Sequence, residues 1–146
     1  TGIMNTLFDS YQPWAGNISH RQSGVLIADR PGKITTYASL GMVDRGELYL
    51  EVGTEVYKGM ILGKRNRPDD LDVNITKEKK LTNMRASSSD ATVVLRPPQN
   101  LSLDQCIEFI AEDELIEITP DNIRMRKMEL DINKRMSAAK KKKEGK

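Results

Sequence analysis

The sequence predicts a mostly β fold with some α (the α+β class), in which short strands build a small β-barrel-like body. Three patterns indicate this class. Short apolar runs of strand length recur at close spacing, separated by turn signals such as Arg30-Pro31-Gly32. Glycines stand every few residues in segment 52–63, as at the tight turns and bulges of small closed barrels. Residues 102–113, by contrast, carry the repeat of one amphipathic helix.

Length and charge narrow the class of protein further. At 146 residues the chain suits one domain that is long enough to bury a core, and with 5% aromatic residues that core must be aliphatic. From residue 134 onward there are seven Lys or Arg and one acid, a net +6, so the preceding residues carry −4 of the total of +2. Because positive charge is local, the chain is not expected to coat nucleic acid with its whole surface.

Cysteine usage and hydropathy indicate the compartment. A single cysteine, Cys106, excludes an internal disulfide framework and fits a reducing environment. No apolar run approaches the roughly 20 residues of a membrane span, and no signal peptide is apparent. We therefore expect a cytoplasmic monomer with no membrane partner. The chain starts at Thr1 without an initiator Met, which suggests a piece of a longer protein.

The first expected strands lie in the N-terminal half. Residues 24–28 form an apolar run, and the turn at residues 30–32 leads into residues 33–40, which are rich in β-branched and aromatic side chains. We expect these two runs to form a β-hairpin. Residues 47–51 alternate as a half-buried strand should, and residues 71–75 predict a further strand after another turn.

One helix is predicted from its start signal and its periodicity. Ser102 and Gln105 form a capping-box pattern, and apolar residues then recur on one face, so we expect a helix over residues 102–113. Cys106 lies on this apolar face, which favours a buried structural thiol over a nucleophile. The opposite face and the residues after it are acidic: Asp104, Glu108, Glu112, Asp113 and Glu114.

The C-terminal part predicts two strands and a basic tail. Residues 115–118 and 123–126 are strand-like, and Arg124 and Arg126 project from one face of the second strand. From residue 130 the composition is helical. We expect this helix to fray into a disordered lysine run at residues 140–143.

Catalytic and metal-binding patterns are missing from the sequence. His20 is the sole histidine and Cys106 the sole cysteine, which leaves too few ligands for a zinc site. Segment 59–65 imitates a phosphate-binding loop, but it is one residue short, ends in Arg65 and lies among predicted strands. We therefore assign no catalytic residue and no metal ligand.

The remaining chemistry is electrostatic and centres on residues 77–87, with the sequence KEKKLTNMRAS, which we call the basic segment. It has no clean period of two or 3.6 and therefore predicts a loop. This loop could contact a phosphate backbone, or it could simply be a solvated surface loop. Residues 64–85 contain seven bases and four acids, a net +3. If the bases before and within this loop lie at one end of a barrel, they form a basic rim.

Such a rim could bind RNA, with Lys and Arg on phosphates and with hydroxyl and amide groups on sugars or base edges. The loop has no aromatic residue, so base stacking would fall to arginine. The candidate RNA-contacting residues are Lys64, Arg65, Arg67, Lys77, Lys79, Lys80, Thr82, Asn83, Arg85 and Ser87, with Arg124, Arg126 and Lys127 as further candidates.

The basic segment also carries a family resemblance. KKLTNMRAS at residues 79–87 resembles the most recognisable segment of the C-terminal domain of the TypA/BipA translational GTPases. The similarity continues, in one order over residues 1–130, through RQSGVLI at 21–27, DRGEL at 44–48, VYKGMI at 56–61, DLDVN at 70–74 and DELIEITP at 113–120.

We expect three parts, of which the resemblance implies the first two. Residues 1–11 would be a remnant of a preceding elongation-factor-G-like domain, and residues 12–130 the family-specific β-barrel-like C-terminal domain. The third part, a basic helical or disordered tail at residues 131–146, follows from composition, because its lysine run is not part of the pattern that carries the resemblance. The resemblance also implies an RNA-binding, ribosome-docking domain, connected with stress response and large-subunit assembly. The loop at residues 77–90 would contact large-subunit rRNA and A-site tRNA.

Enzymatic activity is not expected of this chain, because the GTP-binding domain of the family is missing from it. GTP and Mg would belong to the parent protein, and we expect no cofactor here. A second hypothesis makes the domain a protein–protein interaction scaffold that uses the acidic face of helix 102–113. A free-standing enzyme is disfavoured, since no motif supports a named reaction.

Overall fold

The computed structural model describes residues 5–14, 21–79, 95 and 97–144, the side chains of 142–144 excepted. Its main sheet has the strand order β3-β5-β1-β6. These strands are β1 (Val25–Ala28), β3 (Gly46–Leu48), β5 (Ile61–Arg65) and β6 (Leu71–Val73). Two two-stranded ribbons pair β2 (Gly32–Lys33) with β4 (Glu55–Val56), and β7 (Glu114–Ile118) with β8 (Ile123–Lys127). The helices are α1 (Thr36–Leu40), α2 (Leu103–Phe109) and α3 (Ile132–Glu144).

This architecture confirms a mostly β fold of the α+β class, but the barrel closure expected from the glycine spacing is not shown. The main sheet is open in the described part of the chain, with β3 and β6 at its two edges. β5 pairs antiparallel with both β1 and β3, whereas β6 runs parallel to β1. Because β6 runs parallel to β1, the chain passes from one end of the sheet to the other along β6, so the residues before and after β6 lie at opposite ends.

Strand β1 is the centre of the core. All four of its residues are fully buried, and successive side chains point to opposite faces of the sheet. Leu26 and Ala28 join a cluster with residues of α1, β4 and β6, whereas Val25 and Ile27 join one with Cys106 of α2 and Met125 of β8. The sheet is therefore covered on one face by α2 and the β7-β8 ribbon and on the other by α1 and the small ribbon.

The predicted hairpin of residues 24–40 is wrong. β1 pairs with β5 and β6, and residues 36–40 form the helix α1 in place of a strand. The hydroxyl of Thr35 accepts a hydrogen bond from the backbone N–H of Ala38 at 3.2 Å and so caps the helix. Ala38 and Ser39 then bury against the core. Tertiary packing thus overrides the β propensity of this segment.

Helix α2 begins where predicted but ends early. Ser102 and Gln105 form the complete capping box, and Cys106 is 3% exposed, so the prediction of a buried thiol is confirmed. Burial raises the pKa of that thiol. The expected end at residue 113 is wrong, because Ile110 takes an extended conformation (φ −65°, ψ 148°). The next turn then brings the Glu114 carboxylate back to accept from the Ala111 backbone N–H at 3.0 Å.

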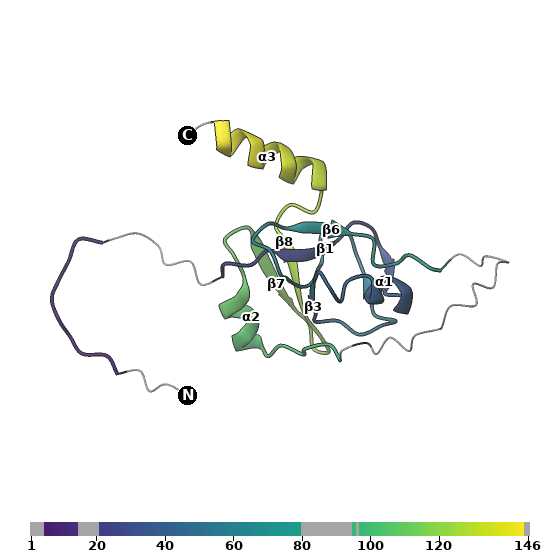
Figure 1. Cartoon of the computed structure of the whole chain (residues 1–146), viewed down its shortest axis with the longest axis horizontal. Coiled ribbons are helices and arrows are strands. Elements are labelled where there is room, and N and C mark those ends of the chain that lie inside the picture. The colour runs from purple at the N-terminus through teal and green to yellow at the C-terminus, as the bar shows by residue number, and fades with distance from the viewer. Residues whose placement is uncertain (1–4, 15–20, 80–94, 96, 145–146) are drawn as a thin grey trace.

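Helix α3 projects from the side of the body that holds β6 and β8 (Figure 1). Asp131 caps it by accepting from the backbone N–H of Asn133 at 2.9 Å, and a salt bridge between Lys58 and Asp131 (2.7 Å) fixes its start. Of the two alternatives expected for the tail, helical or disordered, the structure shows the helix, which runs through residues 140–143. In the described part of the chain, no helix has both the length and the apolar character of a membrane crossing.

Two glycines with positive φ provide a matched test of the packing beneath α3. Gly59 (φ +85°) and Gly53 (φ +90°) both sit in the left-handed region. A Cβ at Gly59 would lie 2.9 Å from the Cα of Leu130, whereas a Cβ at Gly53 would meet nothing within 4 Å. We expect Gly53→Ala to cost about 1 kcal/mol of unfolding free energy and Gly59→Ala about 1–3 kcal/mol more, by urea denaturation. Equal losses of unfolding free energy in the two variants would show that Leu130 can move aside at no cost.

Candidate nucleic-acid interface

The thirteen candidate residues fall into three groups in the structure. Five of them lie outside the described residues: Lys80, Thr82, Asn83, Arg85 and Ser87. A second group has side chains that already bind carboxylates of the body: Arg65, Arg126 and Lys127. The remaining candidates are Lys64, Arg67, Lys77, Lys79 and Arg124.

Lys127 lies in a buried ion cluster and is not available to a ligand. Its side chain is 2% exposed, and its Nζ lies 2.6 Å from a carboxylate oxygen of Asp70, 2.8 Å from Asp113 and 2.9 Å from Glu114. Arg21 completes the cluster with two hydrogen bonds of 2.7 Å to the two oxygens of Glu114. The ammonium of Lys127 is thus bound by three carboxylates, and its burial corrects its prediction as an RNA contact.

The cluster perturbs the pKa values of its members. Burial alone would raise the pKa of Glu114, but hydrogen bonds from Arg21 and Lys127 outweigh it and the pKa is lowered. Burial alone would likewise lower the pKa of Lys127, yet its three carboxylate partners raise it. Both groups are therefore held in their charged forms, which makes the cluster structural in character.

Arg65 and Arg126 are also engaged within the body. The Arg65 residue is 9% exposed, and its guanidinium donates to the backbone carbonyl of Asp69 at 2.8 Å and to the carboxylate of Asp69 at 2.5 Å. Arg126 binds Glu117 at 2.6 Å, and the same carboxylate accepts from the hydroxyl of Tyr57 at 2.5 Å. Hydrogen bonds from Tyr57 and then Arg126 lower the pKa of Glu117.

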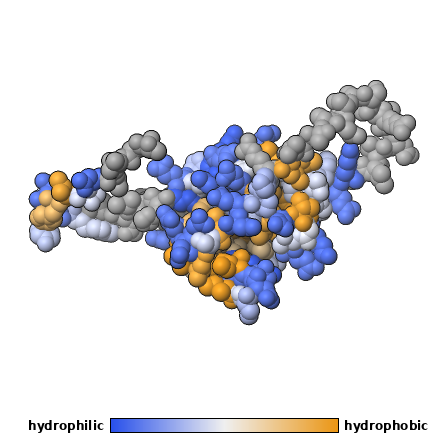
Figure 2. All heavy atoms as spheres, turned by 90° about the horizontal axis from the view of Figure 1, so that it is seen from below, coloured by the Kyte–Doolittle hydropathy of each residue, from blue (hydrophilic) through white to orange (hydrophobic). Residues whose placement is uncertain are grey.

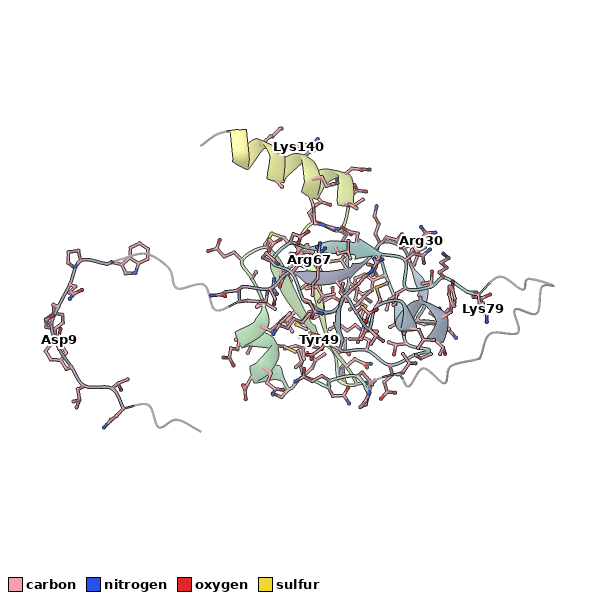
Figure 3. The ribbon with its side chains drawn as sticks, viewed as in Figure 1. Asp9, Arg30, Tyr49, Arg67, Lys79 and Lys140 are labelled. Carbon is pink, nitrogen blue, oxygen red and sulfur yellow. The ribbon has the colours of Figure 1, made fainter. Side chains whose placement is uncertain are left out.

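The predicted single basic rim is not formed by the described bases. Lys64 pairs with Val25 at the start of β1, whereas Lys77 follows β6, whose Val73 lies beside Ala28 at the end of β1. Because β6 runs parallel to β1, the two basic groups lie at opposite ends of the sheet. Figure 3 shows this separation, with Arg67 over the body and Lys79 far to the right.

Residues 77–79 are the described part of the basic segment, and Lys77, Glu78 and Lys79 are all exposed. None of the salt bridges found among the described residues includes them, nor do any include Lys64, Arg67 or Arg124. The hydroxyl of Thr35 donates to the backbone carbonyl of Lys77 at 2.6 Å, which ties the start of the segment to the cap of α1. The fold thus positions the backbone of Lys77, and neither Lys77 nor Lys79 forms an ion pair with a described carboxylate.

Sequence reasoning missed the contribution of α1 to this end of the molecule. Tyr37 is 44% exposed, and the Nζ of Lys77 lies 6.0 Å from the centre of its ring. On its other side α1 borders a hollow of about 320 Å³, lined in part by Val43, Leu95 and Pro97. α1 therefore lies between the two chain stretches that flank residues 80–94. The signal in the sequence was Thr35 as a helix cap, which the β-rich composition around it obscured.

Metal binding has no geometric support in the part of the chain that is described. No group of three or more His, Cys, Asp or Glu side chains is arranged there to hold a metal ion. Where three carboxylates do converge, the ammonium of Lys127 stands among them.

Comparison with known proteins gives one consistent result. The family model described as the TypA/BipA C-terminal domain matches residues 23–132. The chain is 48% identical over 143 residues to the large ribosomal subunit assembly factor BipA of Bacillus subtilis, covering 97% of this chain and 23% of that protein. It is 45% identical over 127 residues to the protein of that name from Synechocystis, covering 87% of this chain and 21% of that protein. The chain thus spans less than a quarter of the length of these relatives.

The ion cluster predicts a large loss of stability when its central acid is neutralised. The Glu114 side chain is 0% exposed, so Glu114→Gln leaves the charges of Arg21 and Lys127 buried beside an amide. We expect a loss of about 3–5 kcal/mol in urea unfolding, the usual cost of breaking a buried ion pair. The exposed Glu112→Gln serves as the matched control and should change stability by less than about 0.5 kcal/mol. A loss at Glu114 as small as the control would contradict the structural role.

The same acid predicts part of the pH dependence of stability. The folded pKa of Glu114 lies below its ordinary value of 4.5, so its contribution is complete above that pH and is lost as the pH falls through the folded pKa. Unfolding free energies measured from about pH 6 to about pH 3 should therefore fall less steeply in Glu114→Gln than in the unaltered chain. Parallel curves would show that Glu114 does not titrate with folding.

Proposed function

This chain belongs to the TypA/BipA C-terminal domain family, and we propose that it docks its parent protein on the ribosome. The docking contact is the basic segment, which binds phosphates of large-subunit rRNA and of A-site tRNA. The observation that supports this most directly is where the unpaired cations lie. Arg65, Arg126 and Lys127 form ion pairs with carboxylates of the body, whereas Lys77 and Lys79 are exposed and have no ion-pair partner among the described residues. Lys64 and Arg67 are exposed and unpaired among these residues as well, but they lie at the opposite end of the sheet from the basic segment.

Charge distribution supports a localised contact. The chain up to residue 133 carries a net −4, so most of its surface repels a polyanion and only a local concentration of cations can approach it. The basic segment supplies such a concentration, with four bases and one acid. Phosphate contacts of this kind fix orientation and register, while Thr82 and Asn83 are suited to hydrogen-bond sugars or base edges.

The chemistry of the parent is proposed to reside elsewhere. GTP and Mg are bound by a part of the parent that this chain does not contain, and the domain described here positions that part on its target. The relatives from Bacillus subtilis and Synechocystis are named as large ribosomal subunit assembly factors. By similarity, we place the parent of this chain in the same work, with a connection to stress response, and in the cytoplasm.

Charge reversal tests the docking contact. Lys77→Glu with Lys79→Glu in the full-length parent should weaken co-sedimentation with large ribosomal subunits. The slope of log K against log salt concentration should shrink by about 0.7–0.9 for each phosphate that the variant no longer neutralises. Lys64→Glu with Arg67→Glu makes the same change in net charge at the opposite end of the sheet and should have the smaller effect. Equal effects of the two pairs would assign binding to net charge alone.

A protein-contact scaffold is the competing function, and α2 gives it a specific basis. Ile107 is 57% exposed on this helix, with the exposed acids Asp104 and Glu108 beside it. Figure 2, a view from below, shows apolar side chains gathered on the lower side of the body, the side on which α2 lies in Figure 1. If this function holds, Asp104→Asn with Glu108→Gln will reduce ribosome association more than reversal of Lys77 and Lys79.

A further inference from the structure

We propose that Tyr37 on α1 is a stacking platform for one unpaired base of single-stranded RNA, and that Lys77 and Lys79 bind phosphates of the same strand. The proposal rests on the proposed function, because both take RNA as the ligand. It assigns a second kind of RNA contact to the region where the basic segment begins. There, stacking on an aromatic face adds to the attraction between lysines and phosphates.

Tyr37 is the most exposed aromatic side chain described from residue 21 onward. Of the aromatic side chains described from residue 21 onward, Tyr49 is 8% exposed, Tyr57 and Phe109 are partly buried, and Tyr37 is 44% exposed. Its neighbours on α1 are turned inward, with Ala38 at 6% and Ser39 at 1% exposure. Because the helix buries its other side, the Tyr37 ring is presented outward.

Tyr37 and Lys77 are held in a defined relation by a single residue. Thr35 caps α1 through its hydroxyl, which also donates to the Lys77 carbonyl at 2.6 Å, and its backbone N–H donates to the Ile75 carbonyl at 3.1 Å. The Lys77 Nζ consequently stands over the Tyr37 ring, 6.0 Å from its centre. A base stacked on this ring would have a cation within reach of its own phosphate. Such preorganisation lowers the entropic cost of binding.

The combination favours unpaired RNA over the other polyanions. A duplex keeps its bases stacked inside the helix and offers phosphates alone, whereas an unpaired base presents a π face to an aromatic ring. An acidic peptide or an anionic membrane would engage the lysines without using the ring face. The basic segment itself contains no aromatic residue, so Tyr37 supplies the stacking surface that the segment lacks.

The test titrates the full 146-residue chain against a fluorescein-labelled oligoadenylate of about ten nucleotides, read by fluorescence anisotropy. Tyr37→Ala and Tyr37→Leu should each weaken binding about 5- to 150-fold, the range for one stacked base, while Tyr37→Phe should stay within about twofold of the unaltered chain. Tyr11→Ala removes a 95% exposed tyrosine from the N-terminal segment and should bind unchanged. The leucine variant retains apolar bulk, so its weaker binding reports the π face, and circular dichroism checks that each variant is folded.

Salt dependence separates the two contacts. In Tyr37→Ala the slope of log K against log salt should be unchanged, whereas Lys77→Gln with Lys79→Gln should flatten it by about 0.7 for each phosphate left without its lysine. Full affinity in both Tyr37→Ala and Tyr37→Leu, with weakened binding in the lysine variant, would overturn the platform and leave the proposed function standing. Unchanged binding in the lysine variant as well would overturn both. Equal sensitivity of a duplex RNA to Tyr37→Ala would also overturn the platform, because a duplex offers no free base.

Discussion

The carboxylate of Glu114 is the constraint on which the rest of this fold depends. It is fully buried, and its two oxygens receive hydrogen bonds from Arg21, Lys127 and the Ala111 backbone. A buried charge without partners would cost several kcal/mol, so the elements that supply these partners must dock together. Arg21 precedes β1, Lys127 ends β8, and Glu114 begins β7. The cluster therefore fastens the β7-β8 ribbon and the end of α2 to the main sheet.

This internal use of charge withholds several cations of the body from a partner. Lys127 and Arg21 are committed to the cluster, Arg65 holds the turn between β5 and β6, and Arg126 holds Glu117. The parallel course of β6 along β1 then delivers the chain to the end of the sheet where Lys77 and Lys79 emerge. The unpaired lysines of the basic segment and the direction of β6 together place a local positive charge at one end of a body that is otherwise net negative.

Local signals in the sequence were sufficient for the elements that depend on them. The Ser102 capping box predicted the start of α2, and strand-like runs predicted β7 and β8, the second of them by its alternation. The sequence did not reveal the features that depend on contacts between distant residues. The early end of α2 depends on the buried partners of Glu114, and no periodicity reports a buried ion cluster. The two groups of bases looked like one rim because strand direction is set by pairing between distant residues. Lys127 was predicted to be a surface base because its three carboxylate partners come from the distant Asp70, from the turn before β7 and from the first residue of β7.

Helix α1 shows how such a long-range effect can create a site. With five residues it is too short to be stable alone, and its start depends on Thr35, which is itself hydrogen-bonded to Ile75 and Lys77 beyond β6. The chain after β6 and the helix therefore stabilise each other. A tyrosine recruited only for packing would gain most by burying its ring, as Tyr49 does. Tyr37 instead stays at the surface beside a lysine, an arrangement that stabilises the free fold little and suits a ligand that brings its own aromatic face.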